Sequence, residues 1–462
     1  MSIATAASDK IRFQEKVAYG LGDTASNFYF QMFMNFLLFF YTDVFGIGAA
    51  AAGTMLFVAR FWDAAIDPGM GVIADRTHTR WGHYRPYLLW GCLPMAVTGV
   101  ATFYTPQLDA TGRLVYAYVT YTLVMMAYTF INIPYSALMG VISPNSLERT
   151  TVSTYRFVLS YGGLFAVQGL TLPLVKYFGR GMAPQAGDQR GFMMVMVVYG
   201  IVGTALFLVT FAGTRERVQP AKGESNALRG DLKDLMHNRP WIMVCFIGVF
   251  ALCHIAVRMG AILYYFKYYV AVPNYKELVT EFMLLGTVGV ILGTSTAGTL
   301  AKWFGKRRAY MGLMTIASAL CVALYFVPKE QIILVFAIWI VISMLFAPTS
   351  PLLWAFYADT ADYAEWKTGR RATGLVFSAA SFSQKVGWLV GGSLAGWMLA
   401  WFGFHPNVEQ TVHAQNGIRL MLTIIPAGFG FLSALAVKFY SLGDDVMVKI
   451  EQDLKARKAE LA

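Results

Sequence analysis

The chain has 462 residues, of which 57% are hydrophobic and only 14% are charged. This composition excludes a soluble enzyme, a disulfide scaffold and a disordered chain, because long apolar stretches alternate with short charged loops. The formal net charge of +11 does not indicate a nucleic-acid partner, because the basic residues gather in those loops, where they set the topology of membrane helices.

Twelve apolar stretches of about 20 residues predict twelve membrane-spanning helices. Their centres lie near residues 33, 58, 96, 125, 165, 202, 252, 288, 318, 342, 386 and 428. The N-terminus is polar and lacks the apolar region of a signal peptide, so we expect the first helix to act as the insertion signal. An even number of spans and the distribution of Lys and Arg predict that both termini are cytoplasmic.

The longest polar interruption, residues 214–240, follows the sixth apolar stretch. It predicts a cytoplasmic linker between a six-helix bundle over residues 1–213 and another over 241–443, with a cytoplasmic tail at 444–462. Leucines at positions 228, 232 and 235 are spaced as in a short amphipathic helix on the membrane surface.

The two halves carry similar loops at matching positions. ADRTHTRWGHYRP follows the second stretch and AKWFGKRRAY the eighth, while SPNSLERTTVSTYRF follows the fourth and ADTADYAEWKTGRRATG the tenth. Two halves with matching basic turns are typical of a secondary transporter built from repeats, whose substrate site lies between them near the middle of the membrane.

A polar stripe runs along the first predicted helix, where four side chains recur at intervals of four residues and therefore share one face. These residues are Asp23, Asn27, Gln31 and Asn35. The fourth stretch adds Thr129 and Asn132 just before Pro134. Amides and hydroxyls both donate and accept hydrogen bonds, which suits a sugar. Any single residue can also serve ordinary bonding between helices, so the stripe as a whole carries the interpretation.

The second stretch holds the densest set of charges, Arg60, Asp63 and Asp67, on one helix face. A charge at the middle of the membrane costs roughly 2.5 to 3.5 kcal/mol, so each needs a partner or a function. Two carboxylates beside one arginine can bind a proton or a small cation. The alternative is a permanent salt bridge, but one arginine cannot neutralise two aspartates.

Three further bases lie within apolar stretches: Arg156, Arg258 and Lys385. Arg156 is near the cytoplasmic end, where it can extend to the interface or pair with loop acids. Arg258 can hold the carboxylate of an acidic sugar or extend to the outer interface. Lys385 is the deepest and can balance the aspartates or contact substrate.

The four cysteines all fall within apolar stretches, which is typical of small buried hydrophobic residues rather than of disulfides or metal ligands. No loop carries a metal-ligand cluster, a phosphate-binding glycine loop or a nucleophile with its base. We therefore expect no cofactor and no enzymatic activity.

Four motifs together resemble the glycoside-pentoside-hexuronide:cation symporters, the melibiose permease family of the major facilitator superfamily. They are YTDVFGI, VARFWDAAIDPGMGVIADRT, RWGHYRPYLLW and ADTADYAEWKTGRR, and the similarity extends from about Lys10 to Lys455. The resemblance implies an all-α integral membrane protein with the twelve-helix major facilitator fold, in two pseudo-symmetric halves of six. It also implies an alternating-access carrier that imports a sugar derivative with H⁺, Na⁺ or Li⁺, acting as a monomer in a bacterial inner membrane.

The resemblance also implies roles for individual residues. Asp63 and Asp67 match the cation-site carboxylates, Thr129 a neighbouring ligand, and Lys385 the charged residue that couples the second half to this site, while Arg60 joins the charge coupling from its position beside the aspartates alone. The candidate sugar-binding residues are Asn27, Gln31, Asn132, Arg156 and Arg258, of which Gln31 and Arg258 come from the stripe and the arginine argument alone. Loop residues that match cytoplasmic gating ion pairs are Arg76, Arg80, Arg149, Asp359, Asp362, Glu365, Arg370 and Arg371.

One departure from the family bears on the coupling ion. Carriers that use sodium have an asparagine where this chain has Ile66, and sodium needs several oxygen ligands, which isoleucine does not provide. A proton needs only one carboxylate, so we favour H⁺. Neutral glycosides, xylosides and uronides all remain open as substrates, and a sugar sensor or a lipid flippase with the same fold is the alternative function.

Overall fold

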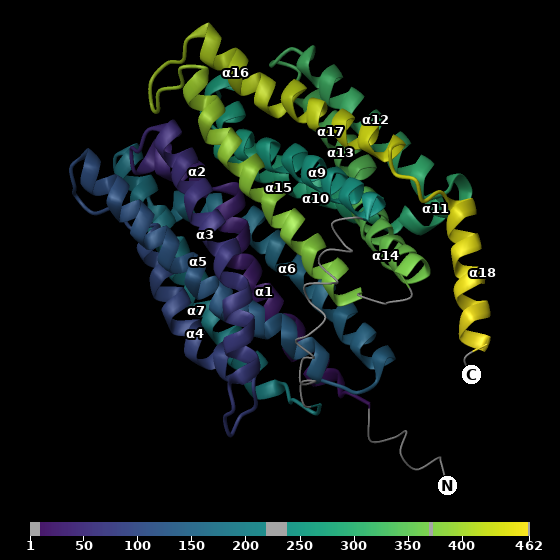
Figure 1. Ribbon diagram of the computed structural model, residues 1–462. Coiled ribbons are helices and arrows are strands. Elements are labelled where there is room, and N and C mark those ends of the chain that lie inside the picture. Colours follow the sequence, from purple (N-terminus) through teal and green to yellow (C-terminus); the bar gives the residue numbers. More distant parts are fainter. Residues whose placement is uncertain (1–9, 219–237, 369–372, 461–462) are drawn as a thin grey trace. The chain divides into compact units, whose positions relative to one another are not determined.

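The computed structural model describes residues 10–218, 238–368 and 373–460, and these are almost entirely helical (Figure 1). Apart from one isolated bridge between Thr79 and Gly82, no β-structure occurs in this part of the chain. Each of the twelve predicted span centres lies within a helix. The predicted linker helix over residues 226–237 and the gating candidates Arg370 and Arg371 lie outside the described residues.

The chain divides into two units, a first unit of Met1–Lys222 with His405–Val408 and a second unit of Gly223–Phe404 with Glu409–Ala462. Helices of the first unit are α1 (Phe13–Asn35), α2 (Leu37–Phe39), η1 (Phe40–Val44), α3 (Ala49–Arg76), α4 (Arg85–Thr102), α5 (Ala110–Val141), α6 (Ser146–Phe178) and α7 (Pro184–Gly213). Those of the second unit are α9 (Arg239–Tyr264), η2 (Tyr265–Val270), α10 (Tyr275–Ser295), α11 (Ala297–Phe304), α12 (Lys306–Tyr325), α13 (Ile332–Phe346), α14 (Thr349–Thr368), α15 (Thr373–Trp401), α16 (Val412–Leu422), α17 (Ile424–Lys438) and α18 (Asp444–Glu460).

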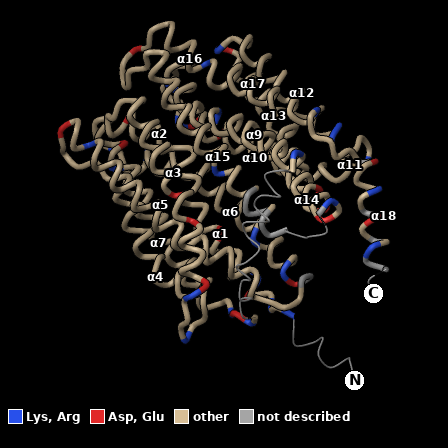
Figure 2. Tube along the Cα trace, viewed as in Figure 1, with Lys and Arg blue, Asp and Glu red and all other residues tan. Residues whose placement is uncertain are grey.

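Nine helical segments in the described residues are long and apolar enough to cross a membrane. Figure 2 shows that Lys, Arg, Asp and Glu gather at helix ends and in loops, while the middles of the helices carry few. Large apolar side chains such as Ile201 and Ile333 are exposed on helix surfaces. Such apolar exteriors are typical of helices that face lipid.

A π-helical segment follows the first long helix of each unit, after the short α2 in the first unit and directly after α9 in the second. In η1, the backbone N–H of Phe45 bonds to the carbonyl of Phe40, and after η2 the N–H of Ala271 bonds to the carbonyl of Phe266. These bonds span five residues, one more than in an α-helix. The two units therefore share a π-helical segment after their first long helix.

In the first unit α1 packs closely against α6, and α3 packs against α5. A Cβ atom on Gly163 of α6 would lie 2.9 Å from the carbonyl oxygen of Thr24, and one on Gly20 of α1 would lie 2.6 Å from Cδ1 of Leu159. Only glycine permits so close an approach of two helices. This contact places the polar stripe of α1 against α6.

Candidate functional site

Two acids of α3 meet a hydroxyl of α5. Asp63 and Asp67 are four residues apart, so both project towards α5, where the Thr129 hydroxyl donates a short hydrogen bond to Oδ1 of Asp63 and lies 3.2 Å from Oδ1 of Asp67. Asp63 is only 6% exposed, and Asp67 is half-buried. A threonine hydroxyl carries one proton and can donate to one carboxylate at a time, so this group of oxygens suits the binding of a proton or a cation.

Arg60 lies one turn before Asp63 and is also buried. Its Nε donates to the hydroxyl of Tyr121 at 3.1 Å, and its Nη2 lies 3.5 Å from the sulfur of Met34. Side chains from α5 and α1 thus contact this guanidinium.

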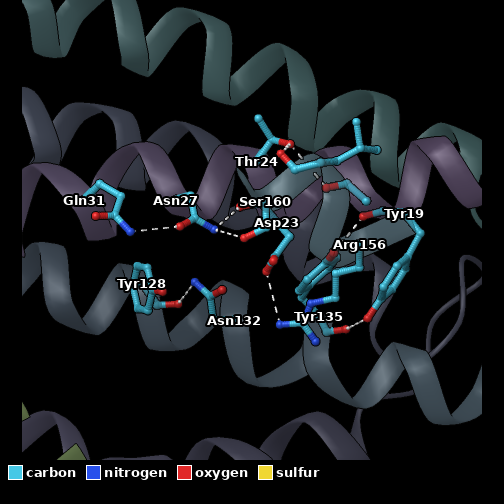
Figure 3. Close-up of polar contacts among 12 residues, drawn as sticks. Tyr19, Asp23, Thr24, Asn27, Gln31, Tyr128, Asn132, Tyr135, Arg156 and Ser160 are labelled. Carbon is cyan, nitrogen blue, oxygen red and sulfur yellow. Dashed lines mark hydrogen bonds and ion pairs between the residues drawn. The ribbon is translucent and has the colours of Figure 1, made fainter. Parts of the chain in front are cut away.

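The polar stripe of α1 forms a chain of hydrogen bonds (Figure 3). Asn27 donates from Nδ2 to the hydroxyl of Ser160 on α6 at 2.7 Å, and Gln31 donates to Oδ1 of Asn27 at 3.4 Å. Asn35 continues the chain by donating to Oε1 of Gln31 at 3.0 Å. The predicted sugar-binding residues Asn27 and Gln31 are therefore in direct contact.

An ion pair lies beside this chain. Nη2 of Arg156 on α6 is 3.1 Å from Oδ1 of Asp23, and its guanidinium carbon lies 5.4 Å from the centre of the Tyr135 ring. Arg156 thus pairs with the acid of the stripe rather than with a loop acid. Asn132 donates to the carbonyl of Tyr128 in its own helix, and Figure 3 shows it on α5, facing the stripe.

Sequence reasoning did not predict four members of this cluster, namely Asp23 as an ion-pair partner, Ser160, Tyr19 and Tyr135. One signal was available, because Asp23 is the single acid of the stripe and Arg156 is a base within an apolar stretch. Two opposite charges that both lack a partner in sequence are expected to pair in the membrane.

Arg258 lies inside the second unit. It is 4% exposed, its Nη1 lies 3.7 Å from the sulfur of Cys321, and its guanidinium carbon lies 5.0 Å from the centre of the Trp339 ring. Extension to the outer interface, one of the two expectations from the sequence, is wrong for this structure. The neighbouring His254 is fully buried, and its Nδ1 bonds to the carbonyl of Pro426 at 2.7 Å.

Lys385 lies on α15 of the second unit and is half-buried. The two aspartates and Arg60 belong to the first unit. The role of Lys385 in charge coupling therefore stays a prediction.

Three of the gating candidates, Asp359, Arg149 and Arg80, have local partners in the described residues. Nζ of Lys306 lies 2.7 Å from Oδ1 of Asp359, and Arg149 donates to the carbonyl of Ser143 at 3.2 Å. Arg80 is exposed and stacks on its neighbour Trp81. Arg76 is exposed at the end of α3, and Asp362 and Glu365 are half-buried on α14. Lys306 was not predicted from the sequence.

A second network of polar contacts, which the sequence also did not predict, joins the end of α7 to the loop before α4. The carboxylate of Glu216 accepts hydrogen bonds from the backbone N–H groups of residues 83, 84 and 85 at 2.8 to 2.9 Å. Arg217 pairs with Glu15 of α1 at 2.8 Å, and these hydrogen bonds raise the pKa of Arg217 above its ordinary value. Glu216 and Arg217 lie outside the helices, so no helical periodicity in the sequence reveals them.

No group of three or more His, Cys, Asp or Glu side chains that could hold a metal ion occurs within the ranges that the structure covers. The cluster on α1, α3, α5 and α6 instead offers hydroxyls, amides, two acids and an ion pair. This chemistry suits a polyhydroxylated solute together with a monovalent cation.

Comparisons with known proteins agree with this chemistry. A family model described as MFS/sugar transport protein matches residues 18–444. A putative glycoside/cation symporter of Escherichia coli strain K12 is 37% identical over 97% of this chain and 96% of its own length. The isoprimeverose transporter of Lactiplantibacillus pentosus is 35% identical over 97% of this chain and 93% of its own length.

Among solved structures, a D-xylose-proton symporter superposes with a TM-score of 0.66 at 14% identity, covering 92% of this chain and 97% of that one. A bacterial homologue of the lysosomal transporter Spinster, in an inward-facing conformation, gives the same TM-score at 13% identity, with 96% of both chains covered. At these identities the likeness shows the fold alone.

Proposed function

Because this chain belongs to the MFS/sugar transport protein family, we propose that it imports a sugar derivative by symport with a cation, H⁺ in preference to Na⁺. Membership of the family confirms the resemblance to the glycoside-pentoside-hexuronide:cation symporters, the major facilitator fold and the expectation of a multi-pass transporter rather than an enzyme. The coupling ion and the substrate class are the parts that we propose.

The observation that carries the proposal is the group formed by Asp63, Asp67 and Thr129. Two acids and one hydroxyl within hydrogen-bonding distance hold a single proton with ease, because protonation removes the repulsion between the carboxylates. Ile66, between the two acids in sequence, supplies no oxygen for sodium. A proton is therefore the favoured coupling ion.

We place the sugar on the stripe of α1 and its neighbours, Asn27, Gln31, Asn132, Asp23 and Arg156. Arg156 is already paired with Asp23, so the pair has no net charge and favours a neutral glycoside or pentoside over a hexuronide. The names of the relatives support this class. A hexuronide is the second candidate, supported by a glucuronide carrier protein homolog of E. coli that is 30% identical over 98% of this chain.

Coupling then follows from charge. Loading the acids of α3 with a proton frees Lys385 or Arg60 from them and raises sugar affinity, and by linkage the sugar raises proton affinity by the same factor. Moving one positive charge inward yields about 2.3 kcal/mol per 100 mV of membrane potential, a gradient of roughly fiftyfold. We propose cytoplasmic termini, an inner-membrane location, a monomer, and gating by the loop charges from Arg76 to Glu365.

The decisive experiment measures the pH of the medium of de-energised cells that express the protein when para-nitrophenyl glucosides, xylosides or glucuronides are added. Proton symport predicts an alkaline shift with the transported sugar, unchanged by removal of Na⁺. A shift that appears only with Na⁺ present, or not at all while labelled sugar enters, would overturn proton coupling.

The sensor and flippase alternatives need a separate measurement, uptake of labelled sugar by proteoliposomes. A sensor binds sugar without flux, and a flippase moves labelled lipid instead. Concentrative sugar uptake driven by an imposed pH gradient excludes both.

A further inference from the structure

Two buried tyrosines of the first unit hold α1 and α5 together next to the ion pair of Asp23 and Arg156. The Tyr19 hydroxyl donates to the carbonyl of Tyr135 at 3.1 Å, and the Tyr135 hydroxyl donates to the carbonyl of Tyr19 at 2.7 Å. Their rings stack with centroids 4.7 Å apart and an angle of 15° between planes. Both side chains are fully buried. We call this reciprocal arrangement the tyrosine clasp.

The tyrosine clasp contacts Arg156 and lies one helical turn from Asp23. The carbonyl of Tyr19 lies one helical turn before Asp23, so the bond from Tyr135 fixes the turn of α1 that presents this carboxylate. The guanidinium of Arg156 lies over the Tyr135 ring, which favours a cation above its face. Figure 3 shows Tyr19, Tyr135 and Arg156 together, with Asp23 reaching Arg156 from the next turn of α1.

The clasp has little room to move. A Cβ on Gly22 would lie 2.7 Å from Cε2 of Tyr135, so α1 passes directly against the ring. Each hydroxyl is also anchored to main chain, which is more rigid than a side-chain partner. The Tyr135 ring is therefore a fixed platform from which the direction of the Arg156 guanidinium is set.

We propose that Tyr19 and Tyr135 are positioning residues for sugar binding, which orient Asp23 and Arg156 so that their remaining donors and acceptors face the substrate. This role rests on the proposed function, since it assigns these residues to its sugar site. Neither tyrosine contacts the sugar, and both act through the ion pair. The tyrosine clasp thereby sets substrate affinity and leaves the acids of α3 unchanged.

The test uses Tyr135→Phe and Tyr19→Phe, which keep the ring stack and remove one hydroxyl each. Purified protein is titrated with para-nitrophenyl β-xyloside, β-glucoside and β-glucuronide, and transport is measured in proteoliposomes. We expect the Kd and KM for the bound sugar to rise between about twofold and tenfold, the factor that corresponds to the loss of one hydrogen bond, while kcat changes little.

A double-mutant cycle separates positioning from general destabilisation. In an Arg156→Lys background, where no guanidinium lies over the ring, Tyr135→Phe should have a smaller effect on sugar affinity than in the native background, because only its effect through Asp23 remains. Additive losses in the two backgrounds would overturn the positioning role.

Tyr199→Phe is the matched control, because Tyr199 is buried, stacks on Phe28 of α1 and hydrogen-bonds to the carbonyl of Ala166. It should leave sugar affinity unchanged, and an equal loss there would show that any buried hydroxyl matters. Unchanged affinity in Tyr135→Phe and Tyr19→Phe, with sugar still bound by the native protein, would overturn this inference alone. If the native protein bound none of the three sugars, the proposed function would be overturned together with this inference.

Discussion

At the scale of single residues, the two acids of α3 differ in their surroundings. Asp63 is buried and holds the short hydrogen bond to Thr129, whereas Asp67 is half-buried and makes the longer contact. The more exposed acid is better placed to exchange a proton with water, and the buried one to share it. In the proposed mechanism, the pair would therefore provide both entry and retention of the coupling ion.

Replacement of Asp67 by Asn should abolish concentrative uptake, because the amide cannot take up and release a proton. Exchange of internal for external sugar should persist in part, since it requires no net movement of the ion. Paired measurements of accumulation and counterflow in membrane vesicles check this. Undiminished accumulation by Asp67→Asn would contradict the proton site.

The burial of Arg258 also leads to a residue-scale prediction. Its guanidinium contacts Trp339 and Cys321 inside the second unit, so we expect Arg258→Met, which keeps the length and removes the charge, to change xyloside and glucuronide uptake by the same factor. Uptake of both sugars, normalised to the amount of protein, provides the measurement. A loss confined to the glucuronide would instead place Arg258 in the substrate site.

At the scale of helices, the contact between α1 and α6 determines how closely the stripe faces Ser160 and Arg156. The two helices touch backbone to backbone at Gly20 and Gly163, and the hydroxyl of Thr24 donates to the carbonyl of Leu159 at 2.8 Å. A shift of a few tenths of an ångström at this contact would separate the groups to which we assign sugar binding.

Gly163→Ala tests that contact. The added methyl group meets the carbonyl of Thr24, so we expect a lower melting temperature and weaker sugar binding. Gly162→Ala is the control on the same helix, because its Cβ would meet nothing within 4 Å, and alanine in a helix interior should be neutral or stabilising by up to about 1 kcal/mol. Thermal unfolding and sugar titration of both variants provide the test. Equal melting temperatures and sugar affinities in the two variants would contradict the close contact.

Much of the arrangement of side chains on each helix could be predicted from the sequence. The period of the stripe placed Asn27 and Gln31 on one face, and the spacing of Asp63 and Asp67 placed both acids together, because helical periodicity is local. The pairing of Asp23 with Arg156 joins positions 133 residues apart, and the tyrosine clasp uses main-chain carbonyls, which are the same in every residue. The enclosure of Arg258 depends on Trp339 and Cys321, two side chains from other helices.

At the scale of the whole molecule, the second unit includes the helix that follows its last membrane segment. Met447, Ile450 and Leu454 of α18 are buried, and Asp453 accepts a hydrogen bond from Nε1 of Trp366 at 2.9 Å. The helix thus packs against α14, which carries the gating candidates Asp359, Asp362 and Glu365. This tail is part of the folded unit.

Ile450→Ala should therefore destabilise the protein, since Ile450 is 1% exposed and truncation of a buried isoleucine costs about 2 to 5 kcal/mol. Val448→Ala on the same helix, where the side chain is 54% exposed, should have little effect. Thermal unfolding in detergent compares the two variants. Equal melting temperatures would indicate that α18 does not pack on the second unit in solution.

The π-helical segments η1 and η2 have a consequence for the aromatic residues at their positions. Each inserts one residue beyond regular α-helical winding, which turns the chain after it by about 100° about the helix axis. Tyr41 in η1 and Tyr265 in η2 are buried in this winding. Deleting a single residue from either segment would restore regular winding and rotate the downstream side chains by more than a quarter turn. We therefore expect both units to tolerate substitution at these points far better than a change of length.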